Sequence, residues 1–247
     1  MTPLPAPGAA LAAAAREAAS AAAKSPRARR LHDARVAAKR LRAYWRLLIV
    51  ALGRREPRRR CRALGRAARV LSDARDAQSL RALALGLAKT AKGPSLHALS
   101  VLLRRLPRPA GRAALAGPLD ALTRELASSA EALETTASGA ASADVRAGRA
   151  RLERRLSRSA RRAARGGRIE DFHAARKRAK DLQYALEALG ASKTETKPSR
   201  VAAEKLGKAR DLTRLSRLAE GALSRALARR AAELQDSALR RLDRVPS

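Results

Sequence analysis

The chain has few of the residues on which catalytic and metal centres depend. Its 247 residues include one cysteine, three histidines and one tryptophan, and aromatic residues make up 2%. A single cysteine excludes an intrachain disulfide and a thiolate metal cluster, and the histidines are too dispersed for a metal motif. No phosphate-binding glycine loop, dinucleotide fingerprint or activated nucleophile is present. We therefore expect a protein that is not an enzyme and needs no metal or cofactor.

Long apolar runs and strand patterns are also lacking. No stretch of about 18 uncharged apolar residues occurs, so we expect no membrane span. The Ala-rich segment 9–23 contains Arg16 and Glu17 and follows no basic residue, so we do not interpret it as a signal peptide and expect a cytoplasmic protein. Alternating strand patterns are nearly absent, whereas glycine and proline punctuate helical segments. The sequence predicts an all-α fold with helices near 8–24, 28–53, 58–89, 95–106, 112–136, 143–165, 169–190, 199–220 and 222–243.

Positive charge is the strongest compositional feature. There are 55 Lys and Arg residues against 22 Asp and Glu residues, which gives a net charge of +33. Such a charge opposes a compact state through self-repulsion and predicts a polyanionic partner, namely nucleic acid, an anionic membrane or inorganic polyphosphate. Most of the cations are Arg, whose planar fork of donors matches phosphate oxygens. The scarcity of aromatic residues argues against single-stranded nucleic acid bound by base stacking.

A basic helical stripe that opens with histidine occurs twice. The copies read HDARVAAKRLRAYWRLL from His32 and HAARKRAKDLQYALEAL from His173. In each, Arg follows the histidine by three residues and Lys by seven, which places the three side chains on one helical face. These residues are His32, Arg35 and Lys39 in the first copy, and His173, Arg176 and Lys180 in the second. Each histidine either donates to phosphate or fastens its helix to a neighbour by one hydrogen bond.

A second pair of segments indicates that the whole chain is duplicated. VLSDARDAQSLRAL at 70–83 aligns with KLGKARDLTRLSRL at 205–218, so Arg75-Asp76 falls on Arg210-Asp211. We predict an N-terminal Ala-rich extension at 1–26 and two pseudo-symmetric antiparallel bundle halves at 27–140 and 141–247. A pseudo-two-fold axis between the halves would bring the two histidine stripes to one central basic groove or pore.

Further basic stripes accompany the histidine helices. On the predicted helix 58–89, Arg62, Arg66 and Arg69 share one face with Asp76. We expect Asp76 and Asp211 to pair with cations of the adjacent histidine helices and hold them in place. Arg151, Arg155, Arg158, Arg162 and Arg165 also align at helical spacing, and we interpret them as a solvated face.

These motifs resemble the CHAD family, the conserved histidine α-helical domains. The resemblance rests on the two histidine segments and the two Arg-Asp segments, and covers about residues 27–245. It implies two four-helix bundles around a basic central groove or pore, binding of inorganic polyphosphate and localisation to polyphosphate granules. Some relatives are associated with polyhydroxyalkanoate storage granules. The second histidine segment departs from the family pattern, with Asp181, Gln183 and Glu187 where cations are usual, so we expect a lopsided site.

The motifs and their faces together define the predicted polyphosphate-binding residues. They are His32, Arg35, Lys39, Arg40, Arg42, Arg46, Arg62, Arg66, Arg69, His173, Arg176, Lys177, Lys180 and Lys208. Three alternatives stay open: a sequence-neutral nucleic-acid binder, a storage-granule coat protein and an enzyme acting on phosphoanhydrides. The first is allowed by charge alone, the second is suggested by the Ala-rich segment at 8–24, and the third would need acids placed to hold a divalent metal.

Overall fold

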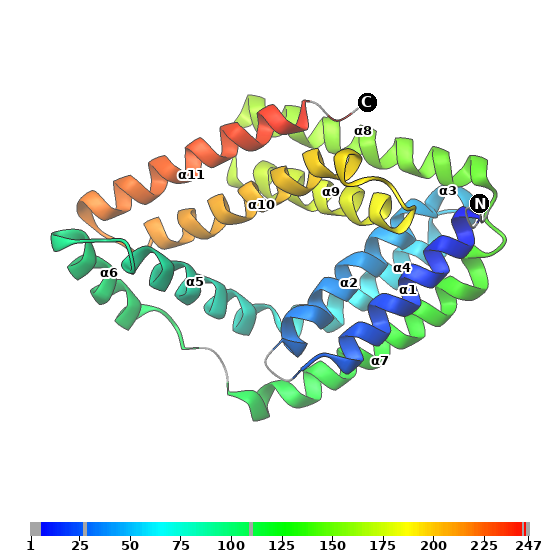
Figure 1. Ribbon diagram of the computed structural model, residues 1–247, viewed down its shortest axis with the longest axis horizontal. Helices are drawn as coiled ribbons and strands as arrows, with labels where there is room; N and C mark the ends of the chain where they lie inside the picture. Colours follow the sequence, from blue (N-terminus) through cyan, green and yellow to red (C-terminus); the bar gives the residue numbers. More distant parts are fainter. Residues whose placement is uncertain (1–5, 27–28, 109–110, 244, 246–247) are drawn as a thin grey trace.

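The computed structural model describes residues 6–26, 29–108, 111–243 and 245. All regular structure in these ranges is helical, which confirms the predicted all-α fold (Figure 1). The helices are α1 (Pro7–Lys24), α2 (Arg30–Leu47), α3 (Ile49–Leu52), α4 (Arg55–Val70), α5 (Ser72–Ala88), α6 (Gly93–Arg105), α7 (Arg112–Ala137), α8 (Ser142–Gly166), α9 (Ile169–Ala188), α10 (Lys193–Ser216) and α11 (Gly221–Leu242). None of the described helices is both long and apolar enough to cross a membrane.

The two histidine helices, α2 and α9, lie against each other in the middle of the molecule. Helices α1, α4 and α7 surround α2, and α8 and α10 flank α9, as Figure 1 shows. The larger hydrophobic core runs through this region and includes the fully buried Trp45, whose Nε1 donates to Ser129 Oγ of α7 at 2.8 Å. The segment set apart as an N-terminal extension also belongs to this core, because Leu11 and Ala15 of α1 are fully buried in it.

A smaller core joins segments that are far apart in the sequence. Leu80 of α5 and Leu102 of α6 pack with Leu212 of α10 and Leu227 of α11. In Figure 1, α5 and α6 accordingly lie beside the C-terminal end of α10 and the N-terminal end of α11. Part of the predicted first half is therefore buried against the second half.

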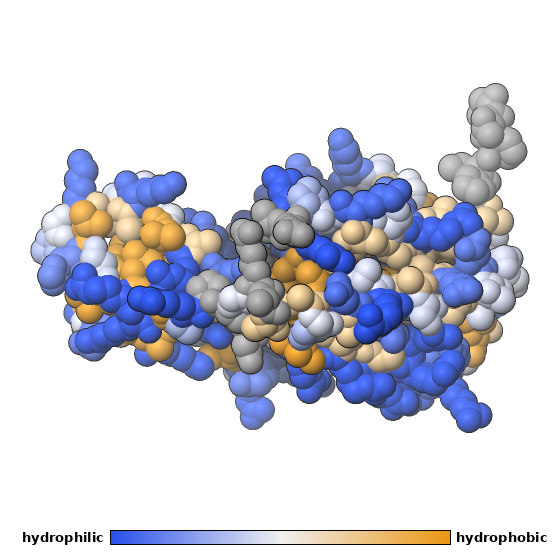
Figure 2. Space-filling view, turned by 90° about the horizontal axis from the view of Figure 1, so that it is seen from below, coloured by the Kyte–Doolittle hydropathy of each residue, from blue (hydrophilic) through white to orange (hydrophobic). Residues whose placement is uncertain are grey.

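Large apolar side chains reach the surface at several separate places, and the most exposed of those described is Val70 of α4, at 67%. Figure 2 shows a face that is hydrophilic over much of its area, with apolar residues at the end where α6 lies and in smaller groups elsewhere. Leu85 of α5 and Leu96 of α6 are 50% and 41% exposed.

Three of the predicted helices differ from the observed ones. The helix predicted over 28–53 is interrupted at Leu48, whose ψ of 3° lies outside the α-helical range, and α3 starts at Ile49. The helix predicted over 58–89 is interrupted at Leu71, whose ψ of 3° takes it out of the α-helical range, and α5 starts at Ser72. The helix predicted to begin at 199 begins at Lys193 instead. Ser192 and Glu195 form a capping box there, which satisfies the free backbone donors and allows the helix to run through Pro198.

Two helical glycines give a paired test of this packing. The Cβ of an alanine at Gly148 of α8 would lie 2.0 Å from the carbonyl oxygen of Leu47, whereas one at Gly86 of α5 would meet nothing within 4 Å. We expect Gly148→Ala to lower the free energy of unfolding by about 2 kcal/mol through overpacking. Gly86→Ala should raise it by about 0.5–1 kcal/mol, because alanine favours the helix. Urea denaturation measures both, and equal effects would contradict the close approach of α8 to α2.

Candidate anion-binding site

The arginine of each histidine motif lies against the next long helix. Arg35 Nη1 donates to the carbonyl oxygen of Ala68 at 2.8 Å and to Ser72 Oγ at 3.0 Å, so its acceptors lie on either side of the interruption at Leu71. Arg176 lies over Gly207 of α10, where a Cβ would come within 3.1 Å of its Nε. Ser72 and Gly207 occupy matching places in the two Arg-Asp segments. The two motif arginines thus lie at matching places, Arg35 held by hydrogen bonds and Arg176 packed over a glycine.

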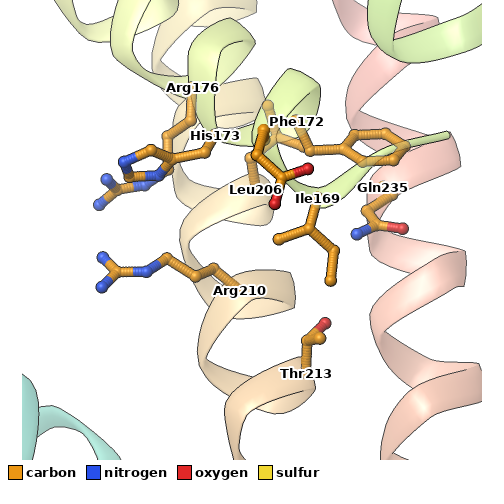
Figure 3. A pocket seen from close by; sticks show the side chains of 9 residues that line it. Ile169, Phe172, His173, Arg176, Leu206, Arg210, Thr213 and Gln235 are labelled. Atoms are coloured by element: carbon orange, nitrogen blue, oxygen red, sulfur yellow. The ribbon is translucent and has the colours of Figure 1, made fainter. Parts of the chain in front are cut away.

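A cavity of about 220 Å³ lies beside the second motif (Figure 3). Its walls come from α9, α10 and α11 and combine cations with apolar side chains. In Figure 3 the nitrogen-bearing ends of His173, Arg176 and Arg210 lie on the same side of the cavity. The lining residues are Ile169, Glu170, Phe172, His173, Arg176, Leu206, Arg210, Thr213 and Gln235. The structure therefore brings His173 and Arg176 together, as predicted, and adds Arg210.

Arg210 is a site residue that the helical-face argument missed. The Arg-Asp repeat drew attention to it, but only its neighbour Asp211 was assigned a role. Arg210 lies on α10, and its position beside α9 depends on how two helices pack. The repetition of the Arg-Asp pair was the signal that could have identified it.

The electrostatics of this region disfavour additional positive charge. Burial, followed by the charges of Lys177, Arg210 and Arg176, lowers the pKa of His173 to about 4, against the opposing charge of Asp76. Burial, followed by the charge of Arg210, also lowers the pKa of Arg176, whose shielded Nε has no acceptor among the described residues. His173 is therefore neutral near pH 7 and offers one donor and one acceptor.

Asp76 does not make the contacts predicted for it. Its Oδ2 accepts from Arg210 Nη2 at 2.8 Å and from Arg214 Nη1 at 2.7 Å, both on α10 rather than on a histidine helix. The sequence places Asp76 on a helical face, but it does not determine which helix packs opposite that face. The prediction assumed a histidine helix, whereas α10 lies there. The side chain of Arg75, its neighbour in the repeat, lies outside the described part of the structure.

The second acidic residue of the repeat lies in a different environment. Burial raises the pKa of Asp211, while the charges of Arg210 and Arg176 oppose that rise. Asp211 is therefore within the electrostatic field of Arg176 on α9, and its role as an orienting group stays a prediction.

Ion pairs connect the two histidine helices where they touch. Arg46 Nη1 lies 2.6 Å from Asp181 Oδ1, and Arg40 Nη2 lies 3.8 Å from Glu187 Oε2. When the two histidine motifs are aligned, Asp181 takes the place of Arg40, and Glu187 that of Arg46. The contact is therefore reciprocal, as a two-fold axis between two helices would require. The acids that depart from the family pattern each neutralise an arginine of the first copy.

Arg40 and Lys180, from the two histidine motifs, lie against the same aromatic ring, with Arg40 Cζ 5.8 Å from the centre of Tyr184. Lys180 Nζ donates to Gln183 Oε1 at 2.9 Å and lies 5.4 Å from the centre of the Tyr184 ring. Lys39 is half-buried and His32 is exposed on α2. The exposed members of the set are His32, Arg62, Arg66, Arg69, Lys177 and Lys208. Because the helix is interrupted at Leu71, Arg62, Arg66 and Arg69 do not share a continuous helical face with Asp76.

The arginine row of α8 is not a uniform solvated face. Arg158, Arg162 and Arg165 are exposed, as predicted, but Arg151 and Arg155 are half-buried. The reason is that α8 packs along α9 and also contacts α2. The leucines that mark the buried side of α8 directly follow these two arginines in sequence, at 152 and 156, which was the available signal.

Comparisons with known proteins identify one family. The family model described as the CHAD domain matches residues 8–200. No curated protein and no solved structure matches the chain. Among the described residues, no group of three or more His, Cys, Asp or Glu side chains is placed to hold a metal ion.

Two acids at the α2–α9 contact allow a matched comparison. Asp181 is 6% exposed and bonds two arginines, Arg46 and Arg178, whereas the side chain of Glu187 is 32% exposed and pairs at longer range. We expect Asp181→Asn to lower the free energy of unfolding by about 3 kcal/mol, because it leaves half-buried arginines without their counter-charge. Glu187→Gln should cost less than about 1 kcal/mol. Urea denaturation measures the free energy of unfolding of both variants. Similar losses of stability in the two would contradict the central role of Asp181.

Proposed function

The chain belongs to the CHAD family, and from that premise we propose that it binds inorganic polyphosphate without catalysis. The binding surface in this proposal is formed by the basic faces of α2, α9 and α10. The observation that carries the proposal is the crowding of half-buried cations around His173, Arg176 and Arg210. Asp76 pairs with Arg210, and a ligand that supplies further negative charge would relieve the remaining repulsion.

Polyphosphate fits this arrangement for chemical reasons. It is a flexible chain of linked phosphates that has no bases, so its recognition requires forks of donors and no aromatic platforms. Arginine supplies such forks and stays charged at any physiological pH. A neutral His173 adds a donor that becomes a cationic donor once phosphate lies beside it. The chemistry proposed for the site is therefore binding, and the cell would hold the protein at polyphosphate granules in the cytoplasm.

A sequence-neutral nucleic-acid binder is the second candidate. The exposed cations Arg62, Arg66 and Arg69 of α4 favour it, since duplex DNA binds to spread basic surfaces. Half-buried cations such as Arg176 favour the thinner ligand, because a duplex cannot reach them. Direct competition between the two polyanions distinguishes the two functions.

The central test is a titration with long-chain polyphosphate at ~0.15 M and ~0.5 M salt, with duplex DNA as competitor. We expect affinity to fall with salt, yet polyphosphate should prevail over DNA at the higher salt. The variant Lys39→Gln/Lys180→Gln removes the lysine at the matching place of each histidine motif. It should lose affinity about tenfold, because each lysine gives up a charge-assisted hydrogen bond.

A charge-matched control separates the motifs from net charge. Arg225→Gln/Arg229→Gln removes two exposed cations from α11 and should retain affinity within about twofold. If both double variants lose equal affinity, or if DNA competes equally per charge, the polyphosphate proposal fails.

Binding should also depend on pH through His173. Its pKa in the free protein is about 4, set by burial and then by Lys177, Arg210 and Arg176 against Asp76. Phosphate beside the ring raises that pKa, so binding takes up a proton and affinity rises as pH falls from 8 towards 5, by at most about tenfold per pH unit. The free protein loses stability over the lower part of this range, because the unfolded histidine gains a proton that the folded one does not.

His173→Gln is the variant that assigns this proton. Calorimetric titrations in two buffers of different ionisation enthalpy should show proton uptake on polyphosphate binding by the parent protein and less uptake by the variant. Equal uptake by the two proteins would rule out His173 as the titrating group.

A further inference from the structure

A second concentration of positive charge lies where α2, α8 and α9 meet. It consists of five arginines around one carboxylate: Arg42, Arg46, Arg151, Arg155 and Arg178, with Asp181. We call these residues the arginine cluster. Asp181 Oδ1 accepts from Arg46 Nη1 at 2.6 Å, and its Oδ2 accepts from Arg178 Nη1 at 3.2 Å. Both oxygens of the one carboxylate are therefore engaged by two of the five arginines.

Two of the other three arginines have unmet hydrogen-bonding capacity. Arg42 Nε and Arg151 Nη1 are shielded from solvent and have no acceptor among the described residues. A shielded donor without an acceptor is destabilising, and more so when it is charged. Among the described residues, these atoms lack the oxygens that guanidinium groups ordinarily bind.

Repulsion between the positive charges also links these groups. Burial and then the charges of Arg178 and Arg151 lower the pKa of Arg155 to about 10. Burial, followed by the charge of Arg46, lowers the pKa of Arg42, and the charge of Arg178 contributes. The repulsion therefore reaches across all three helices, and a single carboxylate does not balance it.

The geometry points to a bound oxyanion as the missing counter-charge. We infer that the arginine cluster is a binding site for one tetrahedral oxyanion, orthophosphate in the cell, which joins α2, α8 and α9. Guanidinium forks pair bidentately with phosphate oxygens, and donors from three helices are suited to a tetrahedral ion. None of these arginines lines the cavity beside His173.

Free orthophosphate is favoured over a segment of polyphosphate. Asp181 is 6% exposed, and the side chains of Arg46 and Arg178 are 18% and 26% exposed. A polymer would need an open path through the cluster, whereas a single ion needs only one opening. The inference therefore does not depend on the function proposed above, and the two can be tested separately.

The test is thermal unfolding with increasing orthophosphate at fixed ionic strength, with chloride as the replaced anion. An ion that binds only the folded protein raises the unfolding midpoint, by about 5–10 °C at a hundredfold excess over its Kd. The dependence of the midpoint on orthophosphate concentration should follow binding to one site. Fixed ionic strength separates this effect from general screening of a chain of charge +33.

Two glutamine variants of α8 form a matched pair. Arg155→Gln removes a member of the cluster, and Arg158→Gln removes an exposed arginine less than one turn further along the same helix. We expect Arg155→Gln to abolish the rise in unfolding midpoint that orthophosphate causes, and Arg158→Gln to retain it. The same rise in both variants, or its loss in both, overturns the inference.

Direct calorimetric titration of the parent protein covers the case in which Arg155→Gln does not fold. One orthophosphate should bind per chain, and the absence of a saturable heat overturns the site. The unfolding midpoint of Lys39→Gln/Lys180→Gln should still rise with orthophosphate, whether or not this variant has lost affinity for polyphosphate. Arg155→Gln should bind polyphosphate like the parent protein, and a loss equal to that of the lysine variant would assign the cluster to the polymer and overturn the free ion as its ligand.

Discussion

Repulsion between like charges is the constraint on which this structure depends. A chain of charge +33 packs its two histidine helices, α2 and α9, against each other. It does so by giving the second copy two acids, Asp181 and Glu187, opposite Arg46 and Arg40 of the first. Both helices also contribute small buried residues, such as Ala38 and Ala179, to the larger hydrophobic core. The sign of a few side chains therefore decides whether the centre of the molecule can form.

The same repulsion connects the fold with the proposed ligands. Where cations crowd around His173 and in the arginine cluster, the free protein holds groups whose charged forms are disfavoured. An incoming anion stabilises those charged forms, so part of the binding free energy comes from relief of an unfavourable state already present in the fold. A site of this kind responds to ligand charge more than to ligand shape. That property suits a linear polymer of phosphates, which has charge but no defined conformation.

Sequence patterns predicted where the helices lie in the chain better than which helices pack against each other. Glycine and proline located most helix boundaries, but Pro198 misled because the capping box of Ser192 and Glu195 starts the helix before it. Motif spacing brought His173 and Arg176 to one cavity, since residues on one helical face stay together whatever surrounds them. Contacts between helices could not be predicted from these patterns: Asp76 pairs with α10, and Arg155 is half-buried beside α9. Spacing along a helix determines the face of a residue, whereas packing determines what lies opposite.

The smaller core has a consequence for the order in which the protein is made. Its leucines from α5 and α6, among them Leu80 and Leu102, are buried against Leu212 and Leu227 of α10 and α11. A ribosome releases α5 and α6 long before these partners, so the two helices emerge with an apolar face that has nothing to cover it. Newly made chains are most prone to aggregation in such an interval. The last quarter of the chain thus completes the first half as well as the second, and a polypeptide truncated before α10 would leave that earlier surface open.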